Sequence, residues 1–158
     1  MAVMRITLGA DHAGFELKEK LKRYLQGQGL QVEDRGTNST VSVDYPDFAR
    51  AVGEDVAAGR ADFGILTCGS GVGMAIAANK VPGVRAANVT SEGEAQLSRE
   101  HNNANVLALG ARLLDDAQAM SIVDKWLHTA FAGGRHERRV EKIAQIEKEE
   151  CLGKGGPA

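Results

Sequence analysis

Residues 63–79 limit the possible folds of this chain more than any other segment, because a short apolar run leads through a glycine-rich turn into a helical pattern. The apolar run begins at Phe63, and the turn carries glycine at three alternating positions before a helix expected over 74–79. Glycines let the backbone come close to a ligand, and the free N–H groups at the start of a helix point toward it. The segment therefore predicts a strand, a loop and a helix that together bind an anion.

Cys68 lies where the expected strand ends and the loop begins. A thiol beside several backbone N–H donors is a candidate base or nucleophile. Most intracellular cysteines are instead buried and inert, so a packing role is the alternative for this residue. The loop also has a simpler interpretation as an ordinary strand-to-helix turn, although three alternating glycines exceed what such a turn needs.

The glycine loop does not match the nucleotide-binding motifs that it superficially resembles. A dinucleotide fingerprint needs glycine at its first, third and sixth positions, and Gly69 and Gly71 fit this pattern but Met74 does not. The loop also follows the third expected strand rather than the first, and no lysine follows it as a P-loop requires. A dinucleotide-dependent oxidoreductase is therefore disfavoured.

Short apolar runs alternate with amphipathic segments along the chain, which indicates strands that alternate with helices. The expected strands are 4–9, 30–34, 63–68, 84–89 and 106–109, and the expected helices are about 15–28, 46–58, 74–79, 91–100, 115–131 and 137–150. This order predicts an α/β protein with a three-layer α/β/α Rossmann-like fold and a five-stranded parallel sheet. One domain is expected over residues 1–152, with a polar loop at 35–47 and a flexible tail at 153–158.

Charge and cysteine content exclude several classes of protein. The formal net charge of −2 gives no reason to expect a nucleic-acid partner. Cys68 and Cys151 are too few and too far apart for a disulfide framework or a metal-ligand cluster, and they fit a reducing compartment. No apolar run approaches membrane-spanning length, and the first residues lack a signal-peptide layout. We therefore expect a cytoplasmic protein with no membrane partner.

Polar side chains follow several of the expected strands. Asp11 and His12 follow the first strand, Cys68 follows the third and Arg112 follows the fifth. The carboxyl ends of parallel strands meet at one edge of a sheet, where ligands bind, so we expect these groups to converge there together with His101. Taken singly, Asp11 could be a helix cap and His101 a polar loop residue.

The last expected helix has charges that oppose its own dipole. Arg135 and Arg139 lie near its start and Glu147 lies near its end, whereas a helix dipole favours acidic residues at the start and basic residues at the end. A solvated charged face explains this pattern. Arginines at a helix start would also bind a ligand anion, with the helix N-terminus assisting them.

Seven short motifs, in this order along nearly the whole chain, are similar to those of a known family. They are Gly9-Ala10-Asp11-His12-Ala13-Gly14, Asp44-Tyr45-Pro46, Cys68-Gly69-Ser70-Gly71-Val72-Gly73, Ala77-Ala78-Asn79-Lys80, His101-Asn102, Asn105-Val106-Leu107 and Gly134-Arg135-His136. On these residues the chain resembles the ribose-5-phosphate isomerase B family, which belongs with the galactose-6-phosphate isomerase subunits. The resemblance implies an aldose–ketose isomerase that interconverts ribose 5-phosphate and ribulose 5-phosphate in the pentose phosphate pathway, without a metal or another cofactor.

The resemblance also implies a role for each matching residue. Cys68 would be the base that moves a proton between C1 and C2, and His101 the acid that opens the furanose ring with help from Asp11. The enediolate oxygens would be held by the loop, that is by Gly69, Ser70, Gly71, Val72 and Gly73. The phosphate would be bound by His12, Arg112, Arg135 and Arg139. Asn102 would contact a sugar hydroxyl, and Tyr45 would line the site.

Two further expectations follow from the family. One branch lacks the cysteine and uses a glutamate just after the glycine loop, whereas this chain has Met74 there and resembles the cysteine branch. The family forms homodimers, or dimers of dimers, whose sites are shared between subunits, and the last helix would be an arm onto the partner. An isomerase of a hexose 6-phosphate such as allose or galactose 6-phosphate, and a non-catalytic sugar-phosphate binding module, remain as alternative functions.

Overall fold

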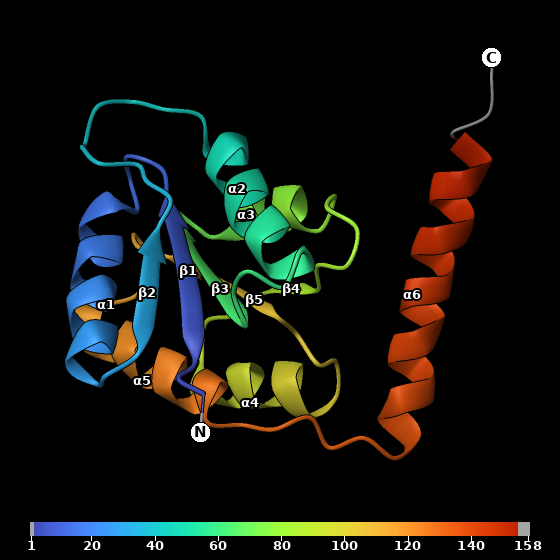
Figure 1. The fold of residues 1–158 in the computed structure, drawn as a ribbon. Coiled ribbons are helices and arrows are strands. Elements are labelled where there is room, and N and C mark those ends of the chain that lie inside the picture. The colour runs from blue at the N-terminus through green and yellow to red at the C-terminus, as the bar shows by residue number, and fades with distance from the viewer. Residues whose placement is uncertain (1, 155–158) are drawn as a thin grey trace.

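The computed structural model describes residues 2–154, of which 152–154 are described by their backbone only. Within this range five strands form one parallel sheet in the order β2-β1-β3-β5-β4 (Figure 1). The strands are β1 (Arg5–Ala10), β2 (Gln31–Asp34), β3 (Phe63–Cys68), β4 (Ala86–Asn88) and β5 (Val106–Gly110). The predicted α/β fold with a five-stranded parallel sheet is confirmed.

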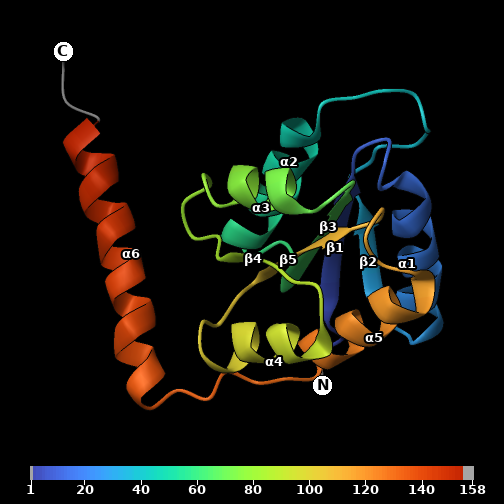
Figure 2. The same cartoon turned by 180° about the vertical axis from the view of Figure 1, so that it is seen from behind.

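Helices cover both faces of this sheet (Figure 2). They are α1 (Phe15–Gly27), α2 (Tyr45–Ala57), α3 (Val72–Ala78), α4 (Glu92–Glu100) and α5 (Asp116–Leu127), whereas the last helix, α6 (Arg135–Lys154), lies away from the sheet. α1, α4 and α5 pack on one face around a core that includes Leu21, Leu107 and Trp126. α2 and α3 pack on the other face around Val52, Leu66 and Met74. The central strands are therefore buried on both sides, which explains why their sequences are continuous apolar runs.

Local sequence signals set several of the helix ends. Ser91 caps α4 by accepting a hydrogen bond from the Glu94 N–H, as expected for a serine at this position. Asp115 and Gln118 form a reciprocal capping box at the start of α5. α5 ends at Leu127 rather than at the predicted 131, because residues 128–134 form an irregular segment that runs to Gly133 and Gly134.

Three other boundaries differ from the prediction. α3 begins at Val72, two residues before the predicted start, because Gly71 already takes the left-handed conformation that ends the loop. α2 begins at Tyr45, so Tyr45 is helical rather than part of the predicted loop 35–47. β4 is shorter than the predicted 84–89, because a side-chain amide, the Asn105 Oδ1, accepts the Arg85 N–H in place of a neighbouring strand.

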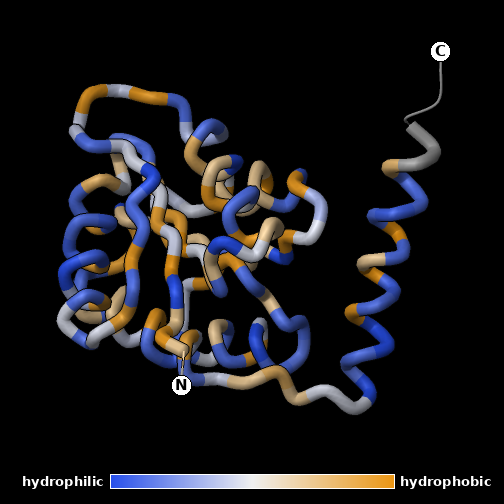
Figure 3. The backbone as a smooth tube through the Cα atoms, viewed as in Figure 1, coloured by the Kyte–Doolittle hydropathy of each residue, from blue (hydrophilic) through white to orange (hydrophobic). Residues whose placement is uncertain are grey.

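α6 stands beside the rest of the molecule in both ribbon views (Figures 1 and 2). It continues to Lys154, which lies in the segment predicted as a tail, and positions 155–158 lie outside the described residues. Apolar and polar bands alternate along it (Figure 3), and Ile143 and Ile146 are 48% and 61% exposed. A groove of about 530 Å³ separates it from the loop around Val84. No helix in residues 2–154 is long and apolar enough to cross a membrane.

Candidate active site

The carboxyl ends of β1, β3 and β5 lie side by side and are joined by hydrogen bonds. The Asp11 N–H donates to the Thr67 carbonyl at 3.3 Å, and the Thr67 hydroxyl donates to the Gly14 carbonyl at 2.8 Å. On the other side of β3, the Ala111 N–H donates to the Cys68 carbonyl at 2.8 Å. The residues that follow these strands are therefore brought to one edge, as the sequence predicts.

The glycine loop wraps around the sulfur of Cys68, whose residue is only 5% exposed. The Gly71 N–H donates to the Cys68 Sγ at 3.1 Å, and the Val72 N–H donates to the Ser70 Oγ at 3.2 Å. Among the hydrogen bonds of residues 2–154, none has the N–H of Gly69 or of Ser70 as its donor. The loop thus presents two free backbone donors next to a thiol.

Gly71 gives the loop its shape. Its φ of +84° and ψ of −15° lie in the left-handed region, which a residue with a Cβ rarely adopts. A Cβ at this position would lie 2.4 Å from the Asn88 Nδ2 and 2.9 Å from the carbonyl carbon of Leu109. The Asn88 amide also donates to the Ser70 carbonyl at 3.3 Å, so it fastens the loop to the sheet.

Two further predicted site residues pack directly against the loop. The guanidinium of Arg112 lies over Gly69, with its Nη1 3.1 Å from where a Cβ of that glycine would be. The ring of Tyr45 lies against Gly73, 2.6 Å from the corresponding position there. A Cβ at Gly73 would force the Tyr45 ring to move, whereas a Cβ at Gly69 would need only a small shift of the Arg112 side chain. Tyr45 borders the loop from α2, and Arg112 borders it from the end of β5.

Asp11 and His12 each make a local hydrogen bond at the same edge. The Asp11 Oδ1 accepts the N–H groups of Ala13 and Gly14 at 2.9 and 3.0 Å, so this carboxylate caps the turn before α1. The His12 Nδ1 accepts the Val43 N–H at 3.2 Å, which leaves the Nε2 of its ring for another partner. Asp11 therefore closes a turn and is not the cap of α1, whose N-cap is Gly14 without a side-chain hydrogen bond, and the Asp11 Oδ2 makes neither of the two turn bonds.

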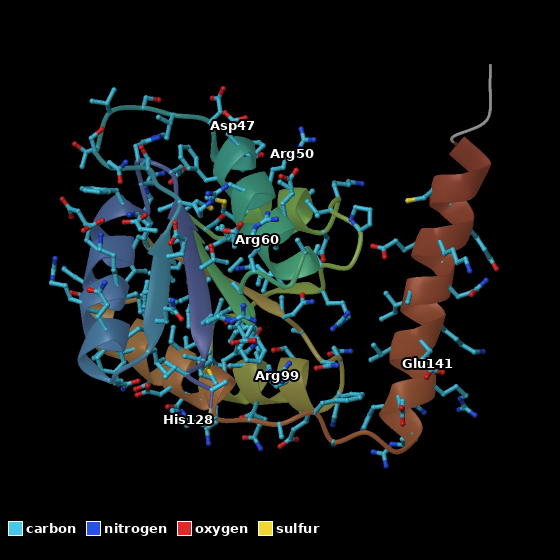
Figure 4. All side chains as sticks on the ribbon, in the orientation of Figure 1. Asp47, Arg50, Arg60, Arg99, His128 and Glu141 are labelled. Atoms are coloured by element: carbon cyan, nitrogen blue, oxygen red, sulfur yellow. The ribbon has the colours of Figure 1, made fainter. Side chains whose placement is uncertain are left out.

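His101 and Asn102 lie at the opposite edge of the sheet, so the prediction that His101 joins the other groups is wrong within a single chain. α4 returns the chain from the carboxyl end of β4 to the amino end of β5, and His101 caps its far end. Arg99, two residues earlier, lies at the end of the molecule away from Asp47 of α2 (Figure 4). The two predicted halves of the site are therefore separated by the length of the sheet.

The start of α6 lies beside His101. The ring of His136 stacks on the ring of His101, with 4.2 Å between centroids and 13° between planes. Removal from water lowers the pKa of His136 below its ordinary value, and the positive charges of His101, Arg135 and Arg139 lower it further. Arg135 and Arg139 thus belong to the group at the amino ends of the strands, not to the group around Cys68.

His136 is a site candidate that the residue-by-residue analysis of the sequence missed, although its motif was noted. Its position between two arginines, one helical turn from Arg139, is the signal that could have found it. Among residues 2–154 there is no group of three or more His, Cys, Asp or Glu side chains placed to hold a metal ion.

Comparison with known proteins identifies a family whose members are similar to this chain in sequence and structure. The family model described as Ribose/Galactose Isomerase matches residues 6–143. Ribose-5-phosphate isomerase B of Escherichia coli is 48% identical over 144 residues, which cover 91% of this chain and 97% of that protein.

Solved structures agree over the same range. Ribose-5-phosphate isomerase B of Clostridium thermocellum superposes with a TM-score of 0.92 at 51% identity, covering 93% of this chain and 99% of that one. The Mycoplasma genitalium ribose-5-phosphate isomerase B with bound ribulose-5-phosphate has a TM-score of 0.90 at 45% identity, and covers 94% of this chain and 99% of that one.

Proposed function

Because this chain belongs to the ribose/galactose isomerase family, we propose that it interconverts D-ribose 5-phosphate and D-ribulose 5-phosphate. The E. coli relative is named for this activity, and the Mycoplasma genitalium structure contains the ketose. The observation that carries the proposal is the buried thiol of Cys68 inside a loop with free N–H donors. Phosphate binding alone would not require a thiol there.

Cys68 acts as the base in this proposal. Isomerisation of an aldose to a ketose moves a proton from C2 to C1 through an enediolate, so it needs one base that can reach both carbons. The negative charge that develops on the oxygens is stabilised by donors that already point at it, here the amides of the loop with Ser70. Met74 is fully buried and cannot take a proton, so it offers no competing base.

Phosphate binding and ring opening also need residues from the edge of the sheet opposite to Cys68. His12 and Arg112 lie at the Cys68 edge, whereas Arg135 and Arg139 lie beside His101. A phosphate bound by all four residues, and a ring opened by His101 next to Asp11, require that a second subunit supplies the missing half. We therefore propose a homodimer, or a dimer of dimers, in which each site takes Cys68 from one chain and His101 from the other.

Exposed apolar residues are available for such an interface. Val72 and Ile76 on α3 are 50% and 59% exposed, next to the glycine loop. Ile143 and Ile146 line the groove between α6 and the body, so α6 has an apolar face that its own chain leaves open. Covering these residues with a second copy would remove them from water, which favours association.

The remaining assignments follow the same arrangement. Asn102, next to His101, contacts a sugar hydroxyl, and Tyr45 lines the site above Gly73. The reaction needs neither a metal nor another cofactor. Cys68 and Cys151 are both free thiols, which agrees with a place in the reducing cytoplasm.

An assay with a chelator tests the proposal. The purified protein should convert ribose 5-phosphate to ribulose 5-phosphate in the presence of EDTA, and should act less well on allose and galactose 6-phosphates. Cys68→Ala should abolish turnover while Cys151→Ala, which removes the other thiol, should keep it. Near-normal turnover by Cys68→Ala would overturn the base assignment, and preference for a hexose phosphate would change the substrate.

A further inference from the structure

The stacked pair of His101 and His136 joins the end of α4 to the start of α6. The Ala132 N–H donates to the Glu100 carbonyl at 3.1 Å, which holds the connecting segment against the end of α4. Gly133 and Gly134 then turn the chain with φ of +67° and +56°, and the His136 N–H donates to the Gly133 carbonyl at 3.0 Å. The backbone thus fixes where the His136 ring can lie.

The His136 side chain is enclosed, with only 8% of the residue exposed. It has no hydrogen-bond or ion-pair partner among residues 2–154, and its ring contact with His101 is the interaction that holds it. A planar ring buried against the ring of a proposed acid does more than fill space, because it restricts the rotation that would turn the acid away from its substrate.

We propose that His136 is a positioning residue that holds the His101 imidazole in one orientation through the stacking of their rings. This inference rests on the proposed role of His101 as the acid. Two imidazolium ions 4.2 Å apart would repel each other, so the stacked arrangement is favoured when the His136 ring is neutral.

The charges around the pair make His136 the neutral partner. Arg135 and Arg139 on α6 and His101 at the end of α4 are positive neighbours that disfavour its protonation, while Glu100 alone opposes them. His136 is therefore a ring that resists taking a charge, and it can stack on the His101 ring without placing a second positive charge beside it.

Nuclear magnetic resonance tests the stacking without any turnover. The chain has four histidines, so His12 and His128 serve as internal controls. His136→Phe should keep the ring-current shift of the His101 ring protons, whereas His136→Ala should lose it. Unchanged His101 resonances in the alanine variant would overturn the inference.

Kinetics separate positioning from phosphate binding. His136→Ala should lower kcat about tenfold, a fraction of what an acid contributes, and leave KM within about twofold, while His136→Phe should recover most of kcat. A rise in KM with unchanged kcat in both variants would contradict the inference, because it would make His136 a phosphate contact. If the wild-type protein does not isomerise ribose 5-phosphate, the proposed function fails, and the resonance experiment still decides whether the pair exists.

Discussion

Replacing Gly71 by alanine should damage both the stability of the fold and the rate of the reaction. Gly71 has a left-handed backbone, and a residue with a Cβ is destabilised by about 1–2 kcal/mol in that conformation. The new Cβ would also lie 2.4 Å from the Asn88 Nδ2 and 2.9 Å from the Leu109 backbone, and such overpacking costs about 1–3 kcal/mol. The two terms together predict that the free energy of unfolding falls by about 2–5 kcal/mol.

Gly59 offers a matched control for this variant. Its φ of +75° is similar, but a Cβ there would meet nothing within 4 Å. Gly59→Ala should therefore lose only the backbone term, about 1–2 kcal/mol. In a chain of this size Tm should fall by about 4–20 °C for Gly71→Ala and by about 2–8 °C for Gly59→Ala.

Calorimetry and initial rates measure the two effects on the same samples. Because the Gly71 N–H donates to the Cys68 Sγ, a shift of the loop misplaces the base, and kcat should fall about 100-fold in Gly71→Ala. Gly59→Ala should keep wild-type kcat, because Gly59 lies before the start of β3 and the loop follows the other end of that strand. Equal losses of Tm in the two variants would refute the steric part of this reasoning, and a wild-type kcat in Gly71→Ala would refute its link to Cys68.

Two further predictions concern a buried ion pair and the proposed interface. Lys18 is 1% exposed and bonds to Asp34 at 2.7 Å, so Asp34→Asn should cost about 3 kcal/mol in urea unfolding at pH 7. Burial opposes ionisation of Asp34, but the hydrogen bonds from Lys18 and Lys22 outweigh it and keep the Asp34 pKa below its ordinary value. The greater free energy of unfolding of the wild type over Asp34→Asn should therefore vanish as the pH falls below about 4. Ile146→Asp should reduce the mass measured by sedimentation, whereas Lys148→Asp, outside the groove, should not.

Much of the fold can be predicted from short-range patterns in the sequence. The alternation of apolar runs and amphipathic segments predicts the parallel sheet, because each helix must bury one stripe against strands that are buried on both faces. Ser91 and Asp115 mark helix starts through their own hydrogen bonds. These features depend on residues within one turn of each other, so the sequence suffices to find them.

Features that depend on distant residues are the ones that the sequence alone does not give. The start of α3 depends on Gly71 fitting beneath Asn88, and the short β4 depends on Asn105, twenty residues after Arg85. The place of His101 depends on the direction in which α4 crosses the sheet. Because α4 follows a parallel strand and runs back across the sheet, its last residues lie at the amino edge, and this separates His101 from Cys68.

Mixing two inactive variants tests the shared site most directly. Cys68→Ala destroys the half around the glycine loop, and His101→Asn destroys the half at the end of α4. If each site takes one half from each subunit, a mixed dimer has one site with both residues intact, and an equal mixture should regain about a quarter of wild-type activity after subunit exchange. Activity that stays at the level of the separate variants, with mixed dimers demonstrated by mass spectrometry, would contradict the shared site.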